Sequence, residues 1–175
     1  MRDGFFRVAA ATPQAKVAEA DVNAERIVEL IKAAAEKGCG AVCLPELTVT
    51  AYTCGDLFQS RTLISAAEKA LGRILEETRD LDILCVLGMP VAVEGSLHNT
   101  AAVFHRGKLL GLPAKSFIPN YSEFYEARYF APAPEPREVT LCGQRVWLGR
   151  KLLFECVNVP ELIAGVEICE DLWGP

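Results

Sequence analysis

The chain has 175 residues, of which 51% are hydrophobic, and its formal net charge is −5. This length allows one domain with a sizeable core, and the acidic balance offers no basic footprint for nucleic acid. The chain has only two histidines and seven scattered cysteines, which argues against a zinc site, and such thiols are typical of a reduced, cytoplasmic protein. It has no apolar run of the ~18 residues that a membrane span needs.

Strands and helices alternate in the first half of the chain. Apolar runs typical of buried strands occupy residues 5–11, 40–44 and 83–93. The helix after the first run should be capped by Asp21 or Asn23 and end at Gly38, and a second helix should span residues 55–78. This alternation predicts parallel strand pairing, with the helices covering a face of the sheet.

The second half of the chain adds hairpins and an aromatic loop. Strand-like runs separated by turn residues predict two hairpins, at 99–105 with 108–112 and at 139–141 with 145–148. The sheet should therefore be mixed. Between the hairpins, residues 116–137 are rich in aromatic residues and proline, which is typical of either a surface loop or a pocket wall held on a rigid scaffold.

Three apolar runs each end on a residue that can do chemistry. Residues 41–45 lead to Glu46, residues 109–114 lead to Lys115, and a strand-like run at 162–168 leads to Cys169. Open sheets place their chemistry at the carboxyl ends of strands, so these residues suggest a base, a cation and a nucleophile. Taken singly, each residue has a plainer explanation, because Cys169 could be a buried structural thiol, Glu46 a cap and Lys115 a solvated side chain.

Three segments resemble the nitrilase, or carbon–nitrogen hydrolase, superfamily. They are Leu-Pro-Glu-Leu at 44–47, Lys115 followed by Pro-Asn-Tyr-Ser-Glu-Phe-Tyr-Glu at 119–126, and Gly-Val-Glu-Ile-Cys-Glu-Asp-Leu-Trp at 165–173. The resemblance covers essentially the whole chain. It implies an α/β fold, a four-layer α-β-β-α sandwich with mixed sheets, and a catalytic triad of Glu46, Lys115 and Cys169.

Within the superfamily, residues 52–58 and 120–126 resemble the glutaminase domain of glutamine-dependent NAD synthetases. The implied reaction is hydrolysis of glutamine to glutamate through a Cys169 thioester, with Glu46 as general base. Lys115 would favour the thiolate and stabilise the oxyanion. The alternatives are a free-standing amidase of the same superfamily that acts on another small amide, and a catalytically inactive fragment.

The resemblance also implies roles for residues around the triad. Glu126, a second glutamate after the lysine, would hold Lys115 in place, and Glu170 would contribute its backbone N–H to the oxyanion. Tyr52 and Phe124 would line the substrate pocket. The plainer alternatives are core packing for the two aromatic residues and, for Glu126, a surface ion pair with Arg128 or Arg137.

The resemblance sets expectations for partners and domain organisation. Residues 1–175 would form a partial carbon–nitrogen hydrolase domain, incomplete at its C-terminus, with the ATP-dependent synthetase domain absent. The expected partners are glutamine and that synthetase domain, which amidates deamido-NAD. No cofactor is expected in this segment, and ATP and Mg²⁺ would serve only the synthetase. An unfinished sandwich exposes a sheet face and edge, so a homo-oligomer is expected.

Overall fold

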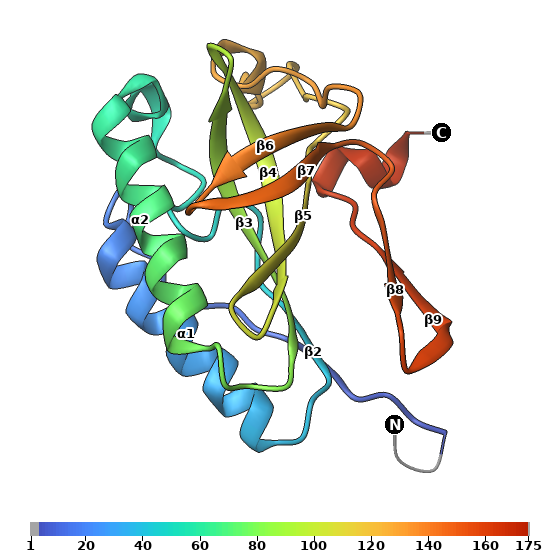
Figure 1. Ribbon diagram of the computed structural model, residues 1–175. Helices are drawn as coiled ribbons and strands as arrows, with labels where there is room; N and C mark the ends of the chain where they lie inside the picture. Colours follow the sequence, from blue (N-terminus) through green and yellow to red (C-terminus); the bar gives the residue numbers. More distant parts are fainter. Residues whose placement is uncertain (1–3, 175) are drawn as a thin grey trace.

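A seven-stranded sheet forms the centre of the fold. The computed structural model describes residues 4–174, and the strand order of the large sheet is β1-β2-β3-β4-β5-β7-β6 (Figure 1). The strands are β1 (Val8–Ala10), β2 (Ala41–Cys43), β3 (Leu84–Val93), β4 (Ser96–His105), β5 (Lys108–Pro113), β6 (Arg137–Leu141) and β7 (Gln144–Gly149). The β1, β2 and β3 strands pair in parallel, whereas β4 pairs antiparallel with β3 and β5, so the prediction of a mixed sheet is confirmed.

Both predicted hairpins are confirmed. The β4–β5 connection turns at Arg106 and Gly107, which both have positive φ, and the β6–β7 connection turns at Cys142 and Gly143. A third hairpin joins β3 to β4, because the long strand expected at 83–93 reverses its direction just beyond Val93. These antiparallel pairs bring the chain back beside the parallel strands without a further helix.

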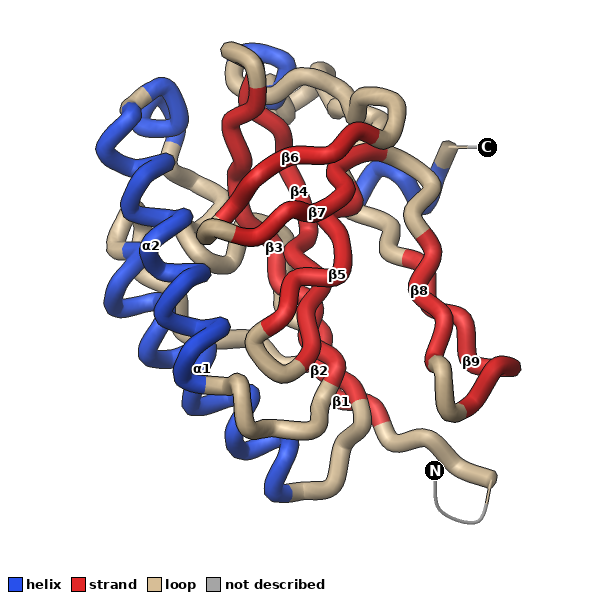
Figure 2. Tube along the Cα trace, in the orientation of Figure 1, coloured by secondary structure: helices blue, strands red, loops and turns tan. Residues whose placement is uncertain are grey.

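Two helices cover one face of the large sheet. The α1 (Ala20–Glu36) and α2 (Arg61–Glu77) helices lie side by side (Figure 2). Their apolar side chains meet the sheet in one continuous core, with Ile27, Ile31, Leu71 and Ile74 fully buried. The period of these positions is that of an amphipathic helix packed on a core. Across residues 4–174, no helix is long and apolar enough to cross a bilayer.

The start of α1 differs from the prediction. Glu19 occupies the N-cap position, and no side chain caps the helix. Asn23 lies inside the helix, fully buried, where its side chain hydrogen-bonds the backbone of Lys16 and the carbonyl of Val49. The side chain of Asn23 therefore stabilises the loop that precedes the helix. Gly38 does end the helix, with φ +68.

The second helix is also divided. Residues 55–59 form a short 3-10 turn, η1 (Gly55–Gln59), and Ser60 is extended before α2 begins at Arg61. This interruption places Phe58 in a small buried cluster beside the large core, together with Leu47 and Phe130. Burial of Phe58 in this cluster explains why one continuous helix over 55–78 was the wrong prediction.

The strand expected before Cys169 lies in a different sheet. Strand β9 (Val159–Gly165) pairs antiparallel with β8 (Leu153–Cys156), and residues 166–168 belong to no strand. The nucleophile candidate is therefore not at the edge of the large sheet. A 3-10 turn, η3 (Cys169–Trp173), carries it instead.

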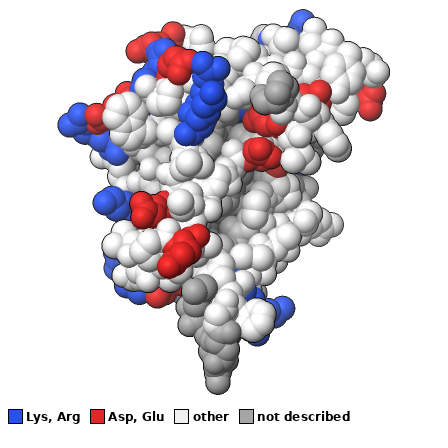
Figure 3. Space-filling view, turned by 90° about the vertical axis from the view of Figure 1, so that its right-hand side faces the viewer, with Lys and Arg blue, Asp and Glu red and all other residues white. Residues whose placement is uncertain are grey.

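The β8–β9 hairpin lies on the side of the large sheet opposite the helices (Figure 1). Phe154 occupies the space that a side chain at Gly111 would need, so the hairpin touches β5 directly. A cavity of about 520 Å³ separates much of the hairpin from the sheet. In Figure 3, which looks onto this side, most of the visible surface is neither acidic nor basic. The hairpin thus begins a third layer, and no helical fourth layer occurs within residues 4–174.

Candidate active site

Lys115 is buried between two carboxylates. It follows β5, its side chain has no exposed surface, and its Nζ donates to Glu46 Oε1 at 2.8 Å. The same Nζ donates to both oxygens of Glu126 at 2.9 Å. Burial by itself would lower the pKa of Lys115, but the hydrogen bonds and charges of Glu46 and Glu126 outweigh it, so the pKa is raised. Lys115 therefore stays protonated as a fixed cation at neutral pH.

The loop after β2 delivers Glu46 to this lysine. It runs so close to β3 that a Cβ at Gly88 would lie 2.2 Å from the Leu47 nitrogen and 2.6 Å from the Glu46 Cα. Hydrogen bonds from Gly88 N to Pro45 O and from Val49 N to Gly88 O hold the loop there. Leu47 has φ +50, which is unfavourable for a residue with a side chain. The absence of a side chain at Gly88 lets the backbone of Glu46 come this close.

Asn99 is a further member of the site that sequence reasoning missed. This β4 residue is 1% exposed, and its Nδ2 donates to Glu46 Oε1 at 2.6 Å. Its backbone carbonyl accepts from Lys115 N at 2.8 Å. Asn99 thus contacts both members of the Glu46–Lys115 pair, and it occupies Oε1, which leaves Oε2 of Glu46 for other chemistry. The short segment Leu-His-Asn-Thr offered no signal beyond a strand pattern.

Glu126 lies in a short 3-10 turn, η2 (Glu126–Arg128), and is 5% exposed. Besides Lys115, it accepts a hydrogen bond from the Tyr52 hydroxyl at 2.7 Å. Burial and this hydrogen bond raise the pKa of Tyr52, so its hydroxyl remains a donor. The alternative surface pairs do not form, because Arg128 pairs with Asp56 and Arg137 pairs with Glu94.

Cys169 is the first residue of η3 and has φ +50, a backbone conformation disfavoured for a residue with a side chain. Burial raises the pKa of its thiol, and the charge of Glu46 adds to this effect. Lys115 and the backbone N–H of Glu170 act in the opposite direction without cancelling it. Lys115 therefore stabilises the thiolate as expected, but burial and the charge of Glu46 outweigh this effect. The resting thiol needs a base to remove its proton.

Glu170 and Asp171, which directly follow Cys169, connect η3 to the loop after Lys115 (the lysine loop). Asp171 Oδ1 accepts backbone N–H groups of Ser116 and Phe117, both at 2.9 Å, and Oδ2 accepts that of Ile168 at 3.3 Å. Glu170 accepts the hydroxyl of Tyr121 at 3.0 Å on both oxygens. Neither Asp171 nor Tyr121 was assigned a role from the sequence, since a pattern of residue types does not reveal which backbone groups an aspartate will meet.

An aromatic pocket of about 210 Å³ adjoins Glu126. The aromatic wall of this cavity consists of Tyr52, Phe58, Tyr125, Tyr129 and Phe130, and the substrate-binding role of Tyr52 stays a prediction. Phe124 is not among its lining residues; it packs edge-on against Tyr121, with ring centroids 5.9 Å apart. The loop at 116–137 is therefore a pocket wall in part, contributed by η2 and its flanking aromatic residues.

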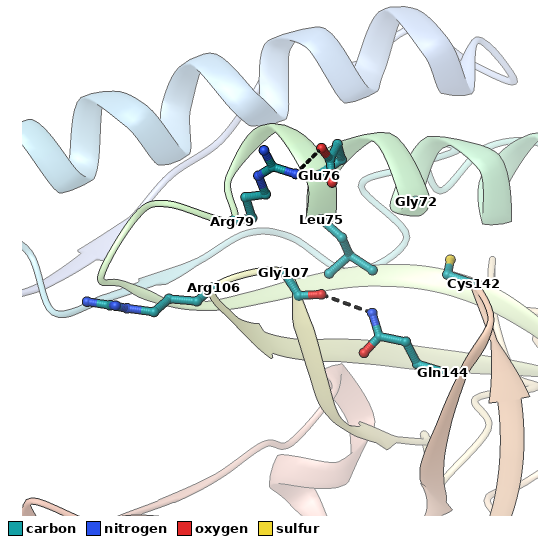
Figure 4. A pocket seen from close by; sticks show the side chains of 8 residues that line it. All are labelled: Gly72, Leu75, Glu76, Arg79, Arg106, Gly107, Cys142 and Gln144. Carbon is teal, nitrogen blue, oxygen red and sulfur yellow. Dashed lines mark hydrogen bonds and ion pairs between the residues drawn. The ribbon is translucent and has the colours of Figure 1, made fainter.

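A further cavity lies away from this site. It measures about 340 Å³ and is formed by α2, the β4–β5 turn and the start of β7 (Figure 4). Its polar groups pair with one another, since Gln144 donates to Gly107 O and Arg79 donates to Glu76. None of the triad residues lines it. Within residues 4–174, no cluster of three or more His, Cys, Asp or Glu could hold a metal ion.

The family comparison identifies the family of the chain. The model of the carbon–nitrogen hydrolase family matches residues 7–175. The chain belongs to the carbon–nitrogen hydrolase family. Curated relatives in this family include a glutamine-dependent NAD(+) synthetase of Mycobacterium tuberculosis, 36% identical over 173 residues, and one of Aquifex aeolicus, 33% identical over 159 residues. These alignments cover 98% and 91% of the chain but only 26% and 24% of the relatives.

Solved structures of this carbon–nitrogen hydrolase family share the fold. A glutamine-dependent NAD(+) synthetase from Cytophaga hutchinsonii superposes with a TM-score of 0.80 at 25% identity, covering 86% of the chain and 26% of that structure. An amidase from Nesterenkonia sp., 22% identical, superposes with a TM-score of 0.63 over 84% of the chain and 56% of the amidase. The nitrilase-like α/β fold expected from the sequence is thus confirmed, and the chain spans about a quarter of the length of its synthetase relatives.

Proposed function

We propose that this chain is the glutaminase part of a glutamine-dependent NAD synthetase. The observation that carries the proposal is Lys115, held between Glu46 and Glu126 beside an exposed cysteine, in a chain similar to such synthetases over 98% of its length. A buried cation is costly unless opposite charges and hydrogen bonds compensate it, and such groups cluster at functional sites. The pairing of Lys115 with two carboxylates next to a thiol therefore supports a catalytic role for this site.

The first half of the proposed reaction forms a thioester. Glu46 Oε2 removes the Sγ proton, and the sulfur attacks the side-chain amide carbon of glutamine. The carbonyl oxygen becomes an oxyanion, which Lys115 Nζ and the backbone N–H of Glu170 stabilise. Collapse of this intermediate breaks the C–N bond, and the proton held by Glu46 leaves with ammonia.

The proposed step would change the hydrogen bonds of Lys115. An ammonium group has three hydrogens, and in the resting site all three are directed to carboxylate oxygens. Lys115 must therefore release one carboxylate oxygen when it binds the oxyanion. Glu126 Oε1 is the suitable one, because it keeps the Tyr52 hydroxyl as a second donor.

The second half of the reaction releases glutamate. Glu46, deprotonated again, takes a proton from water, and the hydroxide oxygen attacks the thioester carbon. The C–S bond breaks, and the thiolate recovers the proton from Glu46. The ammonia would pass to a synthetase domain, which would use ATP and Mg²⁺ to amidate deamido-NAD; we assign neither cofactor to residues of this chain. A nucleophilic thiol suits a reducing, cytoplasmic compartment.

Ammonia release tests the proposal directly. The chain is expected to release ammonia from glutamine faster than from acetamide, and Cys169→Ala should abolish the release. A glutamine-analogue electrophile should label Cys169 and none of the other six cysteines. Equal turnover of acetamide would favour a free-standing amidase, and no turnover of any amide with unlabelled Cys169 would favour a catalytically inactive fragment.

The side of the molecule that carries the β8–β9 hairpin leaves apolar side chains uncovered. Leu153 is 72% exposed, Ile163 57% and Val157 89%. Such a patch is typical of a surface that meets another protein segment or chain. The homo-oligomer expected from the sequence therefore stays a prediction, which sedimentation of the chain at several concentrations tests.

A further inference from the structure

The candidate nucleophile is not held by the large sheet. Cys169 follows the β8–β9 hairpin, whose strands pair only with each other, whereas Glu46 and Lys115 are held on the large sheet. Within residues 4–174 the sulfur makes no hydrogen bond to Glu46 or Lys115, although both charges act on it. Some other contact must therefore place η3 against the lysine loop.

Glu170 of η3 meets the Tyr121 hydroxyl farther along that loop, whereas the Asp171 carboxylate contacts the backbone directly after Lys115. Two of its three hydrogen-bond donors, Ser116 N and Phe117 N, directly follow Lys115, and the third, Ile168 N, directly precedes Cys169. One side chain thus joins the backbone beside the cation to the backbone beside the nucleophile. A charged acceptor makes stronger hydrogen bonds than a neutral one, so this carboxylate is suited to holding the two backbone segments together.

We infer that Asp171 is a positioning residue, which tethers the Cys169 turn to the Lys115 loop and so assembles the triad from two sheets. This inference rests on the proposed function for its catalytic meaning. A displacement of about 1 Å at a reacting group can lower a rate by ~10²-fold, so a tether of this kind controls turnover without touching the substrate.

Glu167 provides a matched control. It carries the same charge and lies as far before Cys169 as Asp171 lies after it. Glu167 is exposed, and its carboxylate makes no hydrogen bond or ion pair within the described part of the chain. Glu167→Ala therefore removes a nearby negative charge without removing a tether, whereas Asp171→Ala removes both.

Amide hydrogen exchange on the 175-residue chain measures the tether itself. In Asp171→Ala, exchange at Ser116, Phe117 and Ile168 should be faster by about tenfold or more, because a lost hydrogen bond to a charged acceptor reduces protection by at least that factor. In Asp171→Asn, one oxygen remains and can still accept from Ser116 and Phe117, so only Ile168 should lose protection. Glu167→Ala should leave all three unchanged.

The pH profile of Cys169 alkylation by iodoacetamide reports the position of the thiol. The charged and titratable groups facing it are Glu46 from the loop after β2, Tyr52 before η1, Lys115 after β5, Glu126 in η2, and Tyr121, whose hydroxyl donates to Glu170 beside the thiol in η3. Release of the turn in Asp171→Ala should move the midpoint down toward the ordinary thiol value of about 8.5. Glu167→Ala should keep the wild-type midpoint.

Several results would overturn the tether. Unchanged exchange at Ser116 and Phe117 in Asp171→Ala is one, and equal effects in Glu167→Ala are another. Labelling of buried Cys85 as fast as Cys169 in both Asp171 variants would show general loss of structure rather than release of one turn. Neither measurement uses glutamine, so a chain that fails to release ammonia would remove the proposed function and leave the tether standing.

Discussion

Substitution of Gly88 by alanine should displace the loop that carries Glu46. A Cβ at this position would lie 2.2 Å from Leu47 N and 2.6 Å from both the Glu46 carbonyl carbon and its Cα, and all three atoms are backbone. No side-chain rotation relieves such a contact. Ordinary contact begins near 3.4 Å, so the loop must retreat by about 1 Å.

Two magnitudes follow from this displacement. Overpacking of a buried contact typically costs about 1–3 kcal/mol, and the close approach of backbone atoms places Gly88→Ala at the upper end. Because Glu46 must meet both Lys115 and the thiol, a shift of about 1 Å should also lower ammonia release by ~10²-fold. Urea unfolding measures the first effect, and an ammonia assay under conditions where the variant is folded measures the second.

Gly72→Ala is the matched control. Gly72 lies inside α2, and its added Cβ would meet only Cys142 Sγ at 3.8 Å. Alanine is favoured over glycine in a helix interior by about 1 kcal/mol, so this variant should be as stable as the wild type or more stable. A Gly88→Ala chain with wild-type stability and ammonia release would refute the argument that the bare backbone at Gly88 positions Glu46.

Three further predictions concern the groups around Lys115. Asn99→Ala removes the donor to Glu46 and should lower ammonia release by about tenfold or more as the base loses its orientation. Thr100→Val, which removes a buried hydrogen bond from the next β4 residue to the Met89 carbonyl of β3, should not lower it, and equal activities of the two variants would exclude the orienting role. Tyr52→Phe should lower the free energy of unfolding by about 1 kcal/mol through the lost bond to Glu126, and a Tyr52→Phe chain as stable as the wild type in urea would contradict it. The pKa of Lys115 is raised in the folded state, so its contribution to stability is complete below its unfolded pKa of about 10.4 and disappears as pH rises through the higher folded value. Midpoints of urea unfolding that stay constant from neutral pH into that range would count against a buried, charged lysine.

The sequence was sufficient to predict the parallel first half of the sheet, and it also proposed Glu46, Lys115 and Cys169 as a triad. The strand patterns before Glu46 and Lys115 are local, and burial on both faces makes such strands continuous apolar runs. The residue types Glu, Lys and Cys also limit the chemistry, since few combinations can activate a thiol against an amide. The resemblance of three ordered segments to one superfamily connected these residues before any distance was known.

Side-chain roles set by neighbours in space were not predictable in the same way. Asparagine is a residue type that often caps helices, yet the buried side chain of Asn23 hydrogen-bonds the carbonyl of Val49 in a loop instead. Asp171 lies two residues after Cys169, but two of its three backbone donors, Ser116 and Phe117, are more than fifty residues away. Hydrogen-bonding capacity is a property of the residue type, whereas the partner is chosen by the packed fold.

The sequence by itself thus determined which groups can react, because acidity, charge and nucleophilicity belong to the side chains. Only the tertiary structure decided that Lys115 would lie between two carboxylates, that Gly88 would admit the Glu46 loop, and that Cys169 would come from a separate hairpin. The physical reason is that these arrangements depend on close packing between segments distant in the chain. Local preferences do not encode such contacts, which form when the sheet, the helices and the hairpin are assembled.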